Sequence, residues 1–179
     1  MAVDPTSDEA LVVALRGGDL EAFERLYDRY ERRLYGYIRR FVAEPSVADD
    51  LFQDVFVTVL RDRTYDPARG RFAAWLFMVA RNRCLGEQRR QRTRDALAEE
   101  LEVRLAPRPA SFDDAGRVHA AVAALPEPQR QLILLKQLGE LTYREIAGLL
   151  GVAEGTIKSR LHAATAALRR LLTEGSAEG

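Results

Sequence analysis

Apolar residues recur every three or four positions along most of the chain, which is the spacing of amphipathic helices. The clearest stripe follows Asp19, a residue type that caps helices well, and runs to about residue 41. Its members are Phe23, Leu26, Tyr27, Tyr30, Leu34, Tyr37, Ile38 and Phe41. No segment alternates between apolar and polar residues with a period of two, so the pattern predicts an all-α fold.

Capping residues, prolines and glycines set the expected limits of the other helices. Ser46 with Asp49 forms a capping pattern, which predicts that the next helix starts at Val47. Pro128 suits the first turn of a helix that stops at Gly139. A loop is expected over residues 65–71 because it holds proline and glycine. Further helices are expected over residues 8–16, 47–60, 72–94, 114–124 and 128–138, and from residue 154 through residue 172.

Size and composition exclude several classes of protein. The chain has 179 residues, 47% of them apolar, and no run approaches the roughly 18 apolar residues of a membrane span. Its acidic, polar start does not resemble a secretory signal. The single cysteine, Cys84, excludes an internal disulfide and fits a reducing cytoplasm. His119 and His162 lie far apart without cysteine partners, so we expect no zinc site and no other cofactor.

The formal net charge of zero results from cancellation between oppositely charged blocks. Residues 1–60 carry 7 basic and 12 acidic groups, whereas residues 61–94 carry 10 basic and 3 acidic groups. Residues 95–114 are again acidic, with 2 basic and 6 acidic groups, and residues 115–179 carry 8 and 6. Local fields follow the blocks rather than the sum, so a nucleic-acid partner stays compatible with overall neutrality.

A pair of short helices is predicted over residues 141–161. Thr142 and Glu145 form a capping box that starts the first helix at Tyr143, and Gly151 allows the tight corner between the helices. Ile157 and Leu161 anchor the second helix. Thr156, Lys158, Ser159 and Arg160 are left pointing outward. The pattern is typical of a helix-turn-helix that binds DNA, although apolar spacing alone does not separate it from an ordinary helical hairpin.

A polar strip interrupts the otherwise apolar helix expected at residues 47–60. It consists of Asp49, Asp50, Gln53 and Asp54. Three interpretations stay open: a solvated helix face, a docking surface in which Phe52 or Phe56 is exposed beside the acidic groups, and a carboxylate metal site. The metal site is the weakest of the three because no histidine lies nearby.

The helix expected at residues 72–94 has aromatic residues at its start and arginines through its second half. Aromatic rings can stack on unpaired bases, and arginines can follow a phosphate backbone. The alternative is structural, with Trp75, Leu76 and Val79 buried and the arginines solvated. The sequence is compatible with a mixture of both. Pro107 and Pro109 within the acidic segment 95–113 predict a linker between two domains, with room for a short helix at its start.

Taken together, these motifs resemble the extracytoplasmic-function sigma factors of bacterial RNA polymerase over about residues 19–173. The resemblance depends on four motifs in the expected order: residues 48–56, residues 72–82, Leu125-Pro126 and residues 155–161. It implies an N-terminal segment over residues 1–18 and sigma domain 2 over 19–94. It further implies a linker over 95–113 and sigma domain 4 over 114–179.

The resemblance also implies partners and roles. Domain 2 would dock on the β′ clamp helices of core RNA polymerase through Asp49, Asp50, Gln53, Asp54 and Phe56. It would open the −10 element through Phe72, Trp75, Arg81, Asn82, Arg83, Arg89 and Arg90. Domain 4 would contact the β flap and read the −35 element of promoter DNA through Tyr143, Arg144, Glu154, Thr156, Lys158, Ser159 and Arg160. An anti-sigma factor would control the protein, which is expected to be neither an enzyme nor inserted in a membrane.

The chain departs from the family pattern in the helix that would read DNA. Ala153 stands where a capping serine is common, and Ala163 and Thr165 stand where arginine is common. Met78 likewise replaces a common basic residue. We therefore expect weaker dependence on the −35 element. The rival interpretation is a stand-alone regulator of the LuxR type, since residues 141–161 also resemble its effector domain.

Overall fold

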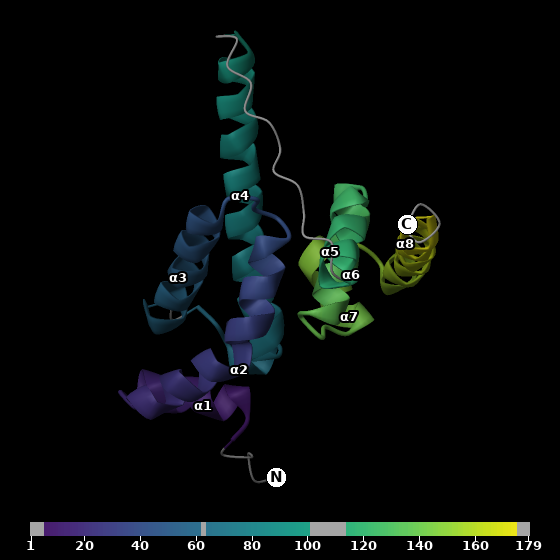
Figure 1. The fold of residues 1–179 in the computed structure, drawn as a ribbon. Helices are drawn as coiled ribbons and strands as arrows, with labels where there is room; N and C mark the ends of the chain where they lie inside the picture. The colour runs from purple at the N-terminus through teal and green to yellow at the C-terminus, as the bar shows by residue number, and fades with distance from the viewer. Residues whose placement is uncertain (1–5, 62–63, 101–113, 175–179) are drawn as a thin grey trace. The chain divides into compact units, whose positions relative to one another are not determined.

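Helices make up all the regular structure in the part of the chain that our computed structural model describes, which comprises residues 6–61, 64–100 and 114–174. The elements are α1 (Asp8–Arg16), α2 (Leu20–Arg39), α3 (Pro45–Arg61), the 3₁₀ helix η1 (Pro67–Arg69), α4 (Phe72–Glu100), α5 (Asp114–Ala124), α6 (Glu127–Gln137), α7 (Tyr143–Leu150) and α8 (Glu154–Glu174). The all-α prediction is confirmed. Figure 1 labels the α-helices. The chain divides into two compact units: the first comprises residues 1–85 and 138–141, and the second comprises residues 86–137 and 142–179, so that one break falls within α4.

The first unit is built on the apolar stripe of α2. Asp19 caps this helix by accepting hydrogen bonds from the next turn, as predicted. The stripe behind it is buried except at Phe23 and Tyr27, which are half-buried. Both α1 and α3 pack against α2. Aromatic pairs join α2 to α4: the ring centroids of Tyr30 and Phe72 lie 5.6 Å apart, and those of Tyr37 and Phe77 lie 5.3 Å apart. The first half of α4 is thereby fixed in the core.

Helix α1 is fastened to the rest of the first unit by polar contacts that the sequence analysis missed. The backbone N–H of Phe72 donates to the Glu9 carboxylate at 3.1 Å, so an acidic side chain of α1 caps the start of α4. Arg16 donates to the carbonyl oxygen of Tyr65 at 2.5 Å. The Tyr30 hydroxyl donates to Asp8. Helix α1 therefore helps to set the position of the aromatic start of α4.

The second unit is organised around α8, against which α5, α6 and α7 pack. Its core includes Leu125, Ile133 and Ala164, with the later leucines of α8 packed beside them. Nearer the start of α8, Ile157 and Leu161 are buried, as the sequence predicted. The apolar anchors of α8 therefore hold one side of the helix in the core and leave the opposite side at the surface.

Most helix limits lie within two residues of the predictions, and the start of α3 and the end of α4 differ for clear physical reasons. Helix α3 begins at Pro45 rather than at Val47, so Ser46 lies inside the first turn and is not the cap. Proline suits this first position because it has no N–H to leave unpaired. Helix α4 continues to Glu100, six residues into the predicted linker. Alanine, leucine and glutamate there are strong helix formers, and no proline follows until Pro107. The rest of that linker, residues 101–113, lies outside the described residues.

Candidate docking and nucleic-acid interfaces

The acidic strip lies on the exposed side of α3. Its four members are all exposed: Asp49, Asp50, Gln53 and Asp54. Tyr35 donates a hydrogen bond to Asp49 at 2.8 Å, which raises the pKa of Tyr35 because the carboxylate stabilises the protonated phenol. Asp54 forms an ion pair with Arg83 of α4 at 3.4 Å. Among the described residues no ion pair engages Asp50, which leaves this carboxylate open to a partner.

An aromatic groove lies beside the strip, between α2 and α3. Its volume is about 850 Å³. The residues that line it include Phe23, Tyr27, Phe52, Phe56, Val57 and Leu60. The prediction of an exposed Phe52 or Phe56 is wrong, because their side chains are only 8% and 4% exposed. Their rings pack on Tyr27, with centroid distances of 5.8 and 4.8 Å. They form the floor of the groove, and the exposed apolar groups are Val57 and Leu60.

The strip is not arranged as a metal centre. Across residues 6–61, 64–100 and 114–174, no three His, Cys, Asp or Glu side chains are placed to hold a metal ion together. Two of the three aspartates instead have protein partners, a tyrosine hydroxyl and a guanidinium group. The arrangement therefore favours the docking interpretation, since an exposed row of carboxylates presents a patterned negative surface.

The aromatic start of α4 is mostly a packing surface. The Phe72 side chain is 1% exposed, and its ring lies 5.6 Å from Tyr30 and 5.5 Å from Tyr65. Burial prevents it from stacking directly on a base, so we revise its assignment from a DNA contact to a support for Trp75. Trp75 is half-buried, 5.7 Å from Phe72 and 5.5 Å from Tyr65. It retains surface for a stacking contact.

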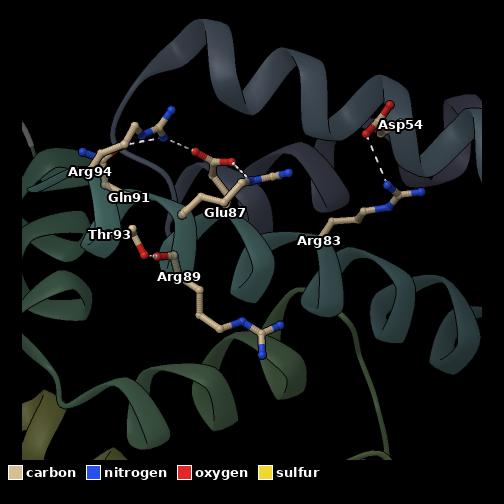
Figure 2. Close-up of polar contacts among 8 residues, drawn as sticks. Asp54, Arg83, Glu87, Arg89, Gln91, Thr93 and Arg94 are labelled. Atoms are coloured by element: carbon tan, nitrogen blue, oxygen red, sulfur yellow. Dashed lines mark hydrogen bonds and ion pairs between the residues drawn. The ribbon is translucent and has the colours of Figure 1, made fainter. Parts of the chain in front are cut away.

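The second half of α4 presents a polar and basic surface. Asn82, Arg83, Arg89 and Arg90 are exposed, whereas Arg81 is half-buried. Figure 2 shows that several of these arginines are already paired within the protein. Arg90 contacts the Glu87 carboxylate at 2.9 Å, and Arg94 contacts the other oxygen of the same carboxylate. The side chain of Arg89 extends away from that cluster (Figure 2).

The predicted helix-turn-helix is present in the second unit. Thr142 and Glu145 form the reciprocal capping box, and α7 starts at Tyr143. Gly151 ends it with φ 67° and ψ 34°, a left-handed conformation that glycine adopts without the strain of a side chain. At the start of α8 the backbone carbonyl of Ala153 accepts the Thr156 amide at 3.0 Å, in place of a side-chain cap.

The outer surface of α8 carries the side chains that the sequence assigned to DNA. Glu154, Lys158, Ser159 and Arg160 are exposed, and Thr156 is half-buried. The Ser159 hydroxyl donates to the Thr156 carbonyl at 3.1 Å. On α7, Arg144 is exposed, and the Lys136 ammonium lies 5.2 Å from the centroid of the Tyr143 ring. These side chains lie on the first turns of a helix whose other face is buried, which is the placement that major-groove readout requires.

Comparison with known proteins shows that two family models match separate parts of the chain. The sequence model of Sigma-70 region 2 matches residues 26–94, and that of Sigma-70, region 4, matches residues 115–168. The ECF RNA polymerase sigma factor RpoE of Cereibacter sphaeroides is 34% identical over 175 residues, covering 93% of this chain and 96% of that protein. The chain belongs to the extracytoplasmic-function sigma factors.

Other relatives and solved structures agree with this family. The RNA polymerase sigma factor CarQ of Myxococcus xanthus is 33% identical, over 89% of this chain and 94% of CarQ. The fold is similar to that of CnrH in complex with the cytosolic domain of CnrY, with a TM-score of 0.67 and 26% identity. The match covers 93% of this chain and 97% of CnrH. The TM-score is also 0.67, with 26% identity, for the sigma factor RpoE in complex with the anti-sigma factor NepR from Bartonella quintana. That match covers 84% of this chain and 96% of RpoE.

Membership of the sigma factors fixes the general activity. This sigma factor directs RNA polymerase to promoters, and it is not an enzyme. The match to region 2 excludes the LuxR-type alternative, because that region precedes the helix-turn-helix in the same chain. Within the described ranges, no helix combines the length and the apolar character that crossing a membrane would need.

Proposed function

We propose that the sigma factor docks on the β′ clamp helices of core RNA polymerase through the acidic strip of α3. The observation that carries this proposal is the exposed carboxylate row along α3, with Asp50 open and the apolar groove beside it. A negative strip flanked by apolar surface fits a basic, partly apolar helical partner. In this proposal sigma domain 2 comprises residues 19–94 and sigma domain 4 comprises residues 114–179. An N-terminal segment, residues 1–18, precedes them, and a linker, residues 95–113, joins them. The protein acts in the cytoplasm.

We propose that α4 opens the −10 element and holds its unpaired bases. Trp75 offers a partly exposed ring, Asn82 offers hydrogen bonds, and the exposed arginines offer contacts to phosphate. Extruding a base costs a few kcal/mol, so several favourable contacts have to be close together. The packing of Trp75 on Phe72 and Tyr65 supports this role because a fixed ring loses little entropy on stacking.

For the second unit, we propose that α8 enters the major groove of the −35 element while α7 crosses the backbone, and that the unit also contacts the β flap. Lys158, Ser159 and Arg160 would reach base edges and phosphates from the first turns of α8. Ala163 is exposed and adds no charge, so the next lysine or arginine of α8 after Arg160 is Arg169, more than two turns later. This supports a promoter choice in which the −10 element carries more of the specificity.

We also propose that an anti-sigma factor controls the protein. The support comes from two structural neighbours, each solved with a bound partner: CnrH with the cytosolic domain of CnrY, and RpoE with the anti-sigma factor NepR. The exposed strip and groove on α3 would be the surface to cover, because hiding them blocks access to the polymerase.

Replacing Asp50 by arginine tests the docking proposal. Asp50→Arg should weaken binding of core polymerase by at least about tenfold, since a like-charge contact at such an interface costs several kcal/mol. Asp95→Arg makes the same charge change on an exposed residue of α4 that is not part of the strip, and should bind core normally. Affinity is measured by calorimetric titration, and circular dichroism checks the helix content of both variants. Unchanged core affinity in Asp50→Arg would reject the assignment of the strip.

A further inference from the structure

An ion pair connects the two surfaces of the first unit that are assigned to different partners. Arg83 of α4 reaches across to α3, where one guanidinium nitrogen lies 3.4 Å from the Asp54 carboxylate. A second nitrogen of the same group donates to the Thr58 hydroxyl at 3.3 Å, and that hydroxyl donates to the Asp54 carbonyl at 2.8 Å. Figure 2 shows Arg83 pointing from α4 toward Asp54. Arg83 thus spans one full turn of α3.

The same geometry leaves the pair easy to open. The Arg83 and Asp54 side chains are 47% and 56% exposed, so water screens their attraction. Both contacts of the guanidinium group are longer than the usual 2.9–3.0 Å of an N–H···O bond. Such a pair changes an equilibrium by about two- to fivefold at most. It therefore biases the two side chains without locking them.

We propose that Arg83 competes with core polymerase for Asp54, so that docking of the strip releases Arg83 to the promoter DNA. This inference depends on the proposed docking role of the strip. A carboxylate that turns toward a basic partner gives up its contact with Arg83, and the freed guanidinium group then adds one contact to the phosphate backbone. Arg83 is thus a positioning residue for docking and a DNA contact only in the holoenzyme.

The other paired arginines of α4 differ in this respect. Arg90 and Arg94 share the Glu87 carboxylate, which lies on α4 itself and outside the strip. A partner that binds the strip on α3 does not compete for Glu87, so these two ion pairs should persist in the holoenzyme. Arg90 therefore serves as the matched control for Arg83, because it is also an exposed arginine of α4 with a carboxylate partner.

The central experiment measures core affinity in a cycle of four full-length proteins: the natural chain, Asp54→Asn, Arg83→Gln and the double variant. Asp54→Asn should weaken core binding. Arg83→Gln should tighten it two- to fivefold in the natural background and have no effect in the Asp54→Asn background. Arg90→Gln should leave core affinity unchanged. Thr58→Val should act in the same direction as Arg83→Gln, by a smaller factor, because it removes the second contact that holds the guanidinium group.

The second arm measures binding to a forked −10 DNA at several salt concentrations. For the holoenzyme, Arg83→Gln should reduce the slope of log affinity against log salt by about 0.7–0.9, the value of one phosphate contact. For the free sigma factor, Arg83→Gln should leave the slope unchanged and Asp54→Asn should steepen it.

The outcomes separate this inference from the docking proposal. If Asp54→Asn leaves core affinity unchanged, the docking role of Asp54 fails and the inference fails with it. If Asp54→Asn weakens docking but Arg83→Gln does not tighten it, docking stands and the competition is overturned. An equal effect of Arg83→Gln in both backgrounds would also overturn it, because that result would reflect a general loss of positive charge near the strip.

Discussion

The hydroxyl group of Tyr37 is an unusual feature at the scale of single residues. Its side chain is fully buried between α2 and α4, and the hydroxyl has no hydrogen-bond partner in the part of the protein that the structure describes. Burial raises the pKa of Tyr37 well above its ordinary value, so the phenol stays protonated. A buried polar group without a partner opposes folding by about 1–3 kcal/mol.

Replacing Tyr37 by phenylalanine should therefore stabilise the first unit by about 1 kcal/mol. The ring would keep its packing on Phe41 and Phe77, and only the unpaired hydroxyl would be lost. Scanning calorimetry of the natural chain and the variant measures the change. Tyr35→Phe is the informative comparison, because that hydroxyl is hydrogen-bonded to Asp49 and its removal should not stabilise the protein. Destabilisation by Tyr37→Phe would indicate that the hydroxyl has a partner after all.

At the scale of elements, local signals were predictable and distant ones were not. The capping box of Thr142 and Glu145, the Asp19 cap and the turn at Gly151 depend on residues within a few positions of one another, and all three are confirmed. The Glu9 cap on α4 joins residues 63 positions apart, and the pair of Asp54 and Arg83 joins residues 29 apart. No periodicity indicates such contacts, because they depend on how helices pack.

Two predictions about α4 were wrong, each for a physical reason. The end of α4 was placed by a change in charge, whereas helix propensity continued through the acidic residues. Phe72 was assigned to the −10 interface through the family resemblance, but Tyr30 of the α2 stripe packs on it in the core. Burial depends on how the helices pack, which the sequence does not show directly. The sequence therefore indicated the region of the −10 interface more reliably than it indicated which residues of that region are exposed.

Helix α8 permits a test of its weak basic charge. Ala163 is exposed and Thr165 is half-buried, both beyond the first turns that read base edges. Ala163→Arg with Thr165→Arg should contact phosphates, and each new contact should steepen the fall of log affinity with log salt by about 0.9. The preferred −35 sequence should not change. Titrations of the holoenzyme on matched and scrambled −35 elements measure both quantities.

A glutamine pair at the same two positions is the control for side-chain length. It should leave the salt dependence as it is in the natural protein, because glutamine adds no charge. If the arginine pair behaves like the glutamine pair, this face of α8 does not meet the DNA backbone.

For the whole molecule, the net charge of zero combines segments of opposite charge that are assigned to different partners. The acidic balance of residues 1–60 and the basic balance of residues 61–94 both fall within the region that matches Sigma-70 region 2 or its N-terminal flank. The region that matches Sigma-70 region 2 thus carries a negative strip on α3 and positive groups on α4, as an adaptor between a protein and a nucleic acid requires. The net charge of the chain carries no information about either surface.

The two units should also differ in their response to core mutations. Leu135 of α6 is fully buried in the second unit, and Leu135→Ala should destabilise that unit by about 2–5 kcal/mol. If the units unfold separately, the first unit should keep its own denaturation midpoint in this variant. A common shift of both units would show instead that they unfold as one cooperative body.

The position of Trp75 allows fluorescence to distinguish separate unfolding of the two units from cooperative unfolding. It is the only tryptophan of the chain, and it lies against Tyr65 and Phe72 in the first unit. Selectively excited tryptophan fluorescence therefore reports the melting of this unit alone, without any added dye, while far-ultraviolet dichroism sums over both. A base that stacks on the same indole ring should quench it, so one intrinsic signal can follow both folding and the arrival of promoter DNA.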